Sequence, residues 1–219
     1  LDNILALSTN LYAMGVWGDT VGNLLYAEQS VCRVRRIAAG STLVVSVAGT
    51  GMCGPGASSG SATSVTFGAT WDIFGDSSGL NYYIPDYTSN FVLLVSVSSN
   101  TVSLLAGNGN GNSLGDGGSA TAAGVHSPLG IYADTFGVTY VCENIDSVVR
   151  KISGGIITLL AGGGSNTGED GPGTAVSFNA PNYIFGDSGG YYLYIADLNN
   201  FKVRRIGLSG AIVVRTVAG

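Results

Sequence analysis

Charged residues are scarce in this chain of 219 residues: Asp, Glu, Lys and Arg together make up only 11% of it. Nine basic residues stand against fourteen acidic ones, and the formal net charge is −5. A nucleic-acid-binding surface needs a net basic footprint, so this balance argues against a nucleic-acid partner and against an anionic membrane surface.

Histidine, cysteine and long apolar runs are equally sparse. His126 is the only histidine, so any Ser-His-Asp scheme must use it. Cys32, Cys53 and Cys142 lack metal-ligand spacing and leave open one disulfide plus a free thiol, or three reduced thiols. We expect Cys32 and Cys142 to pack in strands and Cys53 to be exposed in a Gly-rich loop. No apolar run approaches the roughly 18 residues that span a bilayer, which predicts no membrane insertion.

The chain is rich in glycine, with 35 residues, and in a pattern that repeats four times. An Ala-Gly pair ends a β-branched run at residues 48–49, 106–107, 161–162 and 218–219. In each copy an acid stands nine positions before an Ile or Val, at Glu28, Asp86, Glu143 and Asp197. A further Asp closes another strand of each copy, at Asp19, Asp76, Asp134 and Asp187. Such recurrence indicates a repeat architecture.

Each copy contains four short strand signals. In the last copy, strands A to D are predicted at about residues 182–186, 191–196, 201–206 and 211–217, with short A–B links and long Gly-rich links from D to the next A. Four-stranded antiparallel units that repeat at this length indicate an all-β fold, a β-propeller. We predict one domain over residues 1–219, with blades at about 1–49, 50–107, 108–162 and 163–219.

The repeat resembles the NHL-repeat family of β-propellers. The third copy carries the Gly-Asp-Gly-Gly-x-Ala loop at residues 115–120 and Val-Arg-Lys-Ile at 149–152, and the first and fourth copies carry Val-Arg-Arg-Ile at 34–37 and 203–206. The second copy departs from the pattern, because Leu93-Leu94 replace the basic pair. The resemblance implies a fold rather than an activity, and it implies six-bladed rings. Four copies leave open a four-bladed ring, part of a larger propeller, which we slightly favour, or an arc completed by another chain.

One predicted face of the propeller carries most of the candidate binding groups. The D–A loops and B–C turns share this face and place Asp116, His126, Glu169, Asp170 and Asn199 on it. Asp116 and Asp170 are weak candidates for a Ca²⁺ site, because each loop supplies one or two of the roughly six oxygen ligands required. A turn that uses Asp as a cap and Gly at positive φ is the favoured interpretation. We expect no cofactor and no metal.

The basic pairs on strand C are Arg35-Arg36, Arg150-Lys151 and Arg204-Arg205. Adjacent strand residues point to opposite faces, so each pair is predicted to form ion pairs between blades, with the acids of strand B and of the end of strand A as partners. An anion- or RNA-binding ring, which the resemblance suggests for some members, is disfavoured by the excess of acids.

The low charge and the many tyrosines favour a protein-binding surface, although tyrosines also fill gaps between blades. The uncharged strand C of the second copy, with Phe91, Leu93 and Leu94, is the predicted contact patch at the rim. We therefore predict a non-enzymatic, extracellular or cell-surface propeller for protein interaction or self-assembly. The alternative is a sensor that binds a small molecule or glycan. A metal-dependent lyase or hydrolase is less favoured, because the peptide-amidating lyases of this family need several histidines.

Overall fold

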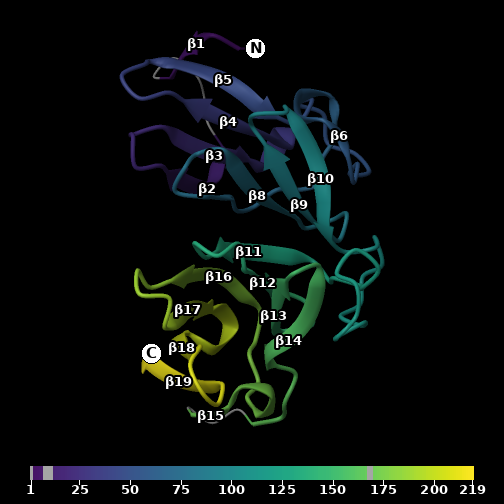
Figure 1. Cartoon of the computed structure of the whole chain (residues 1–219), viewed down its shortest axis with the longest axis vertical. Coiled ribbons are helices and arrows are strands. Elements are labelled where there is room, and N and C mark those ends of the chain that lie inside the picture. The colour runs from purple at the N-terminus through teal and green to yellow at the C-terminus, as the bar shows by residue number, and fades with distance from the viewer. Residues whose placement is uncertain (1, 7–11, 167–169) are drawn as a thin grey trace. The chain divides into compact units, whose positions relative to one another are not determined.

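The structure is a computed structural model that describes residues 2–6, 12–166 and 170–219 (Figure 1). Its elements are β-strands and single 3-10 turns, which confirms the all-β fold class. The chain divides into two compact units, residues 1–105 and 106–219, each with two antiparallel sheets. Within the described residues, no helix is long and apolar enough to cross a membrane.

The first unit contains blades 1 and 2. Blade 1 consists of β2 (Ala13–Gly18), β3 (Leu24–Glu28), β4 (Arg33–Ile37) and β5 (Leu43–Ala48). Blade 2 consists of β7 (Phe74–Gly75), β8 (Asn81–Asp86), β9 (Phe91–Ser96) and β10 (Thr101–Ala106). In both, the four strands follow one another as a meander, as the repeat predicted.

The second unit contains blades 3 and 4. Blade 3 consists of β11 (Pro128–Ala133), β12 (Thr139–Glu143), β13 (Val148–Ser153) and β14 (Ile156–Gly162). Blade 4 consists of β16 (Pro181–Gly186), β17 (Tyr192–Asp197), β18 (Lys202–Gly207) and β19 (Val213–Ala218). The predicted strands of the last copy are therefore confirmed to within about two residues.

A short fifth strand, absent from the prediction, lies at the outer edge of three sheets. These strands are β1 (Ile4–Leu5) on β5, β6 (Gly60–Ser61) on β10 and β15 (Gly171–Pro172) on β19. Blade 3 has a single bridge, Ser119 to Ile156, at the equivalent place. Each segment that precedes a blade thus pairs with strand D of that blade and covers its edge.

The Asp at the end of strand A caps the A–B turn in all four blades. Asp134, for example, accepts hydrogen bonds from the backbone N–H groups of Phe136 and Val138, and Gly137 adopts a positive φ. Asp19, Asp76 and Asp187 accept bonds from the corresponding turns. The expectation that these acids pair with the strand C arginines is therefore wrong: their oxygens stabilise a local turn.

Within each unit, the facing surfaces of the two blades form one hydrophobic core. Leu25 and Ala27 of blade 1 cluster with Ile84 and Leu93 of blade 2. In the second unit, Tyr140, Cys142 and Val149 of blade 3 cluster with Leu193, Ile195 and Ile206 of blade 4.

The A strands approach closely where an aromatic residue of one blade meets a glycine of the next. Trp17 packs against Gly75, and Tyr132 packs against Gly186; a Cβ at either glycine would lie within 2.7 Å of the ring. One position of the repeat, two residues before the Asp that caps the A–B turn, holds Trp17, Tyr132 and Phe185. This aromatic residue therefore fits against the following blade in both units.

Candidate functional site

Three blades contain a fully buried arginine on strand C. Arg35, Arg150 and Arg204 are each at most 1% exposed. Each pairs with the acid at the end of strand B of its own sheet: Arg35 with Glu28 at 3.5 Å, Arg150 with Glu143 at 3.0 Å and Arg204 with Asp197 at 3.5 Å. The prediction of ion pairs is correct, but these pairs lie within one blade and not between blades.

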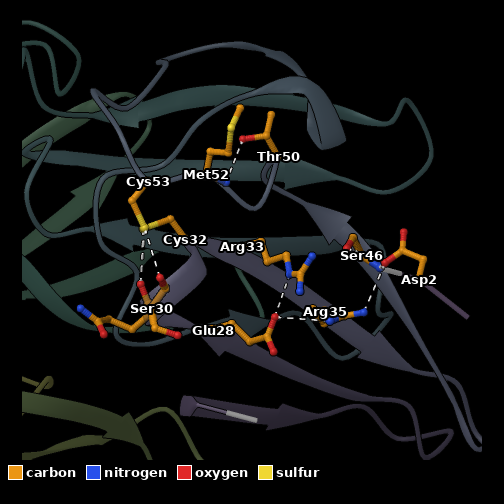
Figure 2. Close-up of polar contacts among 11 residues, drawn as sticks. Asp2, Glu28, Ser30, Cys32, Arg33, Arg35, Ser46, Thr50, Met52 and Cys53 are labelled. Atoms are coloured by element: carbon orange, nitrogen blue, oxygen red, sulfur yellow. Dashed lines mark hydrogen bonds and ion pairs between the residues drawn. A yellow bond between two sulfur atoms is a disulfide. The ribbon is translucent and has the colours of Figure 1, made fainter. Parts of the chain in front are cut away.

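A second carboxylate reaches two of these arginines from the loop at the edge of the sheet. Asp116 lies 2.9 Å from Nη2 of Arg150 and also accepts a hydrogen bond from its Nε. Asp2 lies 3.3 Å from Nη2 of Arg35 (Figure 2). Asp116 therefore compensates a buried guanidinium through its Oδ1 atom.

Blade 2 lacks this network, because Leu93 occupies the arginine position and is fully buried in the core. Its strand B acid, Asp86, accepts hydrogen bonds from the backbone N–H groups of Gly68, Ala69 and Ser89 instead. Burial raises the pKa of Asp86, and these hydrogen bonds only partly offset the effect. The predicted rim contact at Leu93 is therefore wrong; Phe91 and Leu94 are half-buried.

The second basic residue of each pair points to the opposite face. Burial raises the pKa of the Tyr82 hydroxyl in blade 2, and the nearby charge of Arg36 offsets part of this rise, so Arg36 does face a second blade. Arg205 lies over the ring of Tyr192 in its own blade, with 4.6 Å between Cζ and the ring centroid. Lys151 is half-buried.

His126 belongs to a polar cluster that joins the D–A loop to the B–C turn of blade 3. Its Nδ1 lies 2.8 Å from Oδ1 of Asp146, and its backbone N–H donates to Glu143. The single hydroxyl of Ser113 lies within hydrogen-bond reach of the carboxylates of both Glu143 and Asp146 and can donate to either. The cluster confirms that loop and turn lie side by side. Sequence reasoning missed Ser113 and Asp146, because neither position carries the repeat pattern.

We expect the replacement of Asp146 by asparagine to destabilise the second unit at neutral pH. Partial burial opposes ionisation of Asp146, but hydrogen bonds from Ser113 and His126 outweigh it and lower its pKa. A lowered pKa contributes stability above the pKa of the unfolded chain, and this contribution disappears as the pH falls through the folded value. Since the carboxylate is partly exposed, the loss should be about 0.2–1 kcal/mol. Urea unfolding at neutral and acidic pH checks this; an equal difference at both pH values would contradict it.

Asp170 and Asn199 of the predicted binding face do not join this cluster. Asp170 lies 3.8 Å from Arg215, and its Oδ1 accepts a hydrogen bond from the backbone N–H of Thr216. The side chain of Asn199 donates to Asn179. Glu169 lies outside the described residues. Among the residues that the structure describes, no group of three or more His, Cys, Asp or Glu side chains could hold a metal ion.

Cys32 and Cys53 form a disulfide, and Cys142 is a buried free thiol (Figure 2). The bond links the B–C turn of blade 1 to the following Gly-rich segment, 21 positions further along the chain. The expectation that Cys32 is only a packing residue, and Cys53 an exposed thiol, is therefore wrong. Disulfides persist in oxidising compartments, so the bond indicates an extracytoplasmic location.

The face of blade 4 opposite its hydrophobic core carries aromatic side chains, and the ring of Phe185 at its edge lies 5.5 Å from that of Tyr132 in blade 3. We define this aromatic face by Phe185, Tyr192, Tyr194 and Val203, which alternate with buried residues on adjacent strands. Phe185 is 62% exposed, and the other three are 37–39% exposed. Its counterparts Trp17 and Tyr132 are covered by a following blade.

The sheets, their repeat and their pairwise packing define the chain as a set of β-propeller blades. Comparison with solved structures agrees. One chain of a nidogen–laminin complex matches with a TM-score of 0.66 at 12% identity, over 94% of this chain and 65% of that one. Virginiamycin B lyase from Staphylococcus aureus matches with a TM-score of 0.59 at 14% identity, over 96% of this chain and 57% of that one.

An auxiliary nutrient binding protein from Bacteroides thetaiotaomicron matches with a TM-score of 0.59 at 17% identity, over 91% of this chain and 46% of that one. The chain thus spans about half to two thirds of the length of these propellers. No protein-family model and no curated protein matches it. At these identities the likeness shows the fold alone, and it includes both lyases and binding proteins.

Proposed function

We propose that this chain is a non-enzymatic, extracellular propeller module that binds protein, including further copies of its own kind, through the aromatic face of blade 4. The observation that carries this proposal is the exposure of Phe185, because the same position in blades 1 and 3 packs against a glycine of the next blade. The partner surface that fits it is the side of another blade that carries the glycine of strand A and the buried arginine of strand C.

The chemistry of the aromatic face suits such a contact. Tyr194 stands opposite Phe185 and Arg205 in the sheet, so the apolar rings and one guanidinium form a continuous surface. Burial of each large apolar side chain in a contact contributes about 1.5–3 kcal/mol. Aromatic residues and arginine are also the side chains most enriched in the centres of protein interfaces.

Two further features support this proposal. The disulfide fits an extracellular setting, and one propeller of similar fold comes from a nidogen–laminin complex. A lyase activity is not proposed, because His126 is the only imidazole and it faces the carboxylate of Asp146.

Size-exclusion chromatography with light scattering tests the self-association. We expect the mass to rise with protein concentration, and we expect Phe185→Ser with Tyr194→Ser to abolish this rise. Phe136→Ser is the matched control, because Phe136 is 90% exposed in the A–B turn of blade 3, outside the aromatic face. A strict monomer at high concentration, or equal association of both variants, would refute self-assembly through this face.

A further inference from the structure

A pocket lies at the outer edge of blade 4, between the short strand β15 and the segment that leads into β19. Its volume is about 310 Å³. Pro172, Ala211, Ile212 and Val213 form an apolar wall, and Asp170 and Arg215 supply one charge of each sign at its side. This volume is at the lower end of the roughly 300–1,000 Å³ of small-molecule sites, so the pocket suits a compact ligand.

The two charges are additions to the repeat. Strand D carries Val45 in blade 1 and Thr158 in blade 3 at the register position of Arg215. In each of blades 1, 3 and 4, one residue of the preceding segment donates its backbone N–H to the carbonyl directly before strand D. Three residues before this donor stand Asp170 in blade 4, Asn3 in blade 1 and Gly117 in blade 3. The fold of a blade therefore requires neither charge.

The stability of blade 4 does not explain this pair either. The two side chains are 59% and 54% exposed, and the 3.8 Å between Nη1 of Arg215 and Oδ2 of Asp170 exceeds a hydrogen bond. An exposed ion pair of this kind contributes little to stability, because solvent screens it. The hydrogen bond from the N–H of Thr216 to Oδ1 of Asp170 fixes the carboxylate, so that Oδ2 is the oxygen nearer to Arg215.

We propose that this pocket binds an α-amino acid with an aliphatic side chain. A single α-carbon separates the ammonium and carboxylate groups of such a ligand, and this spacing matches that of the fixed pair. The ligand carboxylate would accept hydrogen bonds from the guanidinium of Arg215, a geometry that arginine favours. The ammonium would donate to Oδ2 of Asp170, and the aliphatic side chain would cover Ile212 and Pro172. Because the pocket is open and its charges are solvated, we expect a dissociation constant of about 1 mM.

Amide NMR spectra of the labelled chain during titration with L-leucine test the proposal. Saturable shifts should appear at residues 170–172 and 211–216. N-acetyl-leucinamide, which keeps the side chain but lacks both charges, should bind at least about tenfold more weakly, because it forms no charge-assisted contact. Equal binding of the two compounds, or no shifts at concentrations well above the expected constant, would overturn the proposal. Preference for the amino terminus of a leucine peptide over the free amino acid would also overturn it, in favour of a peptide site.

Three variants separate recognition from folding. Arg215→Thr installs the residue of blade 3 and should abolish the shifts while the remaining spectrum stays unchanged. Ala211→Trp should fill the pocket without altering either charge and should give the same loss. Lys151→Gln removes a positive charge from blade 3 and should leave binding unchanged. Unaltered leucine binding in both pocket variants would refute the site, and none of these outcomes bears on the aromatic face.

Discussion

Arg150→Leu is expected to lower the free energy of unfolding of the second unit by about 3–5 kcal/mol, the usual cost of breaking a buried ion pair by removing one partner. Arg150 is fully buried and faces Glu143 at 3.0 Å and Asp116 at 2.9 Å. Without the guanidinium, Glu143 keeps its contacts to Ser113 and His126 but has no buried cation beside it. The variant therefore leaves the negative charge of Glu143 buried in the sheet, where burial opposes its ionisation.

The loss should depend on pH in a defined direction. Burial raises the pKa of Glu143, and the charge of Arg150 lowers it in part. Removal of Arg150 therefore raises this pKa further. A carboxylate whose pKa is higher in the folded than in the unfolded chain binds more protons when folded, so stability falls as the pH rises above the unfolded value. The difference from the wild type should accordingly be largest at neutral pH and shrink towards pH 4.

Blade 2 supplies the matched control for this experiment. It has Leu93 in place of the arginine. Ser58 aligns with Asp116, because each stands four residues before the residue whose backbone N–H donates to the carbonyl directly before strand D, Ala62 in blade 2 and Ala120 in blade 3. Arg150→Leu combined with Asp116→Ser copies this natural solution and should recover part of the loss. Hydrogen exchange in residues 128–162 measures the second unit directly, because Trp17 and Trp71 both belong to the first. An unchanged exchange rate in Arg150→Leu would contradict a stabilising role of the network.

The sequence contains the strand pattern of each blade because that pattern is local. The Asp and the positive-φ Gly of the A–B turn lie within a few residues of each other, so one copy suffices to predict the turn. The repeat also indicates that Arg150 needs an acid. It does not indicate which one, because Asp116 lies 34 residues away and reaches the arginine only when its loop pairs with strand D.

The aromatic face and the pocket could not be predicted for a related reason. Alternation shows that Tyr192 and Tyr194 share one side of a strand, but the same pattern fits a residue covered by the next blade. Only the exposure of Phe185, set against the covered positions of Trp17 and Tyr132, distinguishes the two. The pairing of Asp170 with Arg215 likewise crosses 45 positions of sequence and follows from the short strand β15, which carries no hydrophobic alternation.

Removal of the disulfide by Cys32→Ala with Cys53→Ala is expected to lower the free energy of unfolding of the first unit by about 3 kcal/mol. The bond closes a loop across 21 positions, and it restricts the unfolded chain far more than the folded one. In the folded protein it joins the B–C turn of blade 1 to the Gly-rich segment that continues to β6 (Figure 2). This segment has few side chains with which to hold its own position.

Tryptophan fluorescence during urea unfolding measures this loss, because Trp17 and Trp71 both report on the first unit. Cys142→Ala is the matched control: Cys142 is buried and unpaired in blade 3, so its truncation should leave the first-unit transition unchanged. Reducing agent should shift the wild-type transition to that of the double variant and leave the double variant unaffected. A reductant-insensitive wild type would show that the thiols are not bonded in the folded protein, and it would remove the chemical support for an oxidising, extracytoplasmic setting.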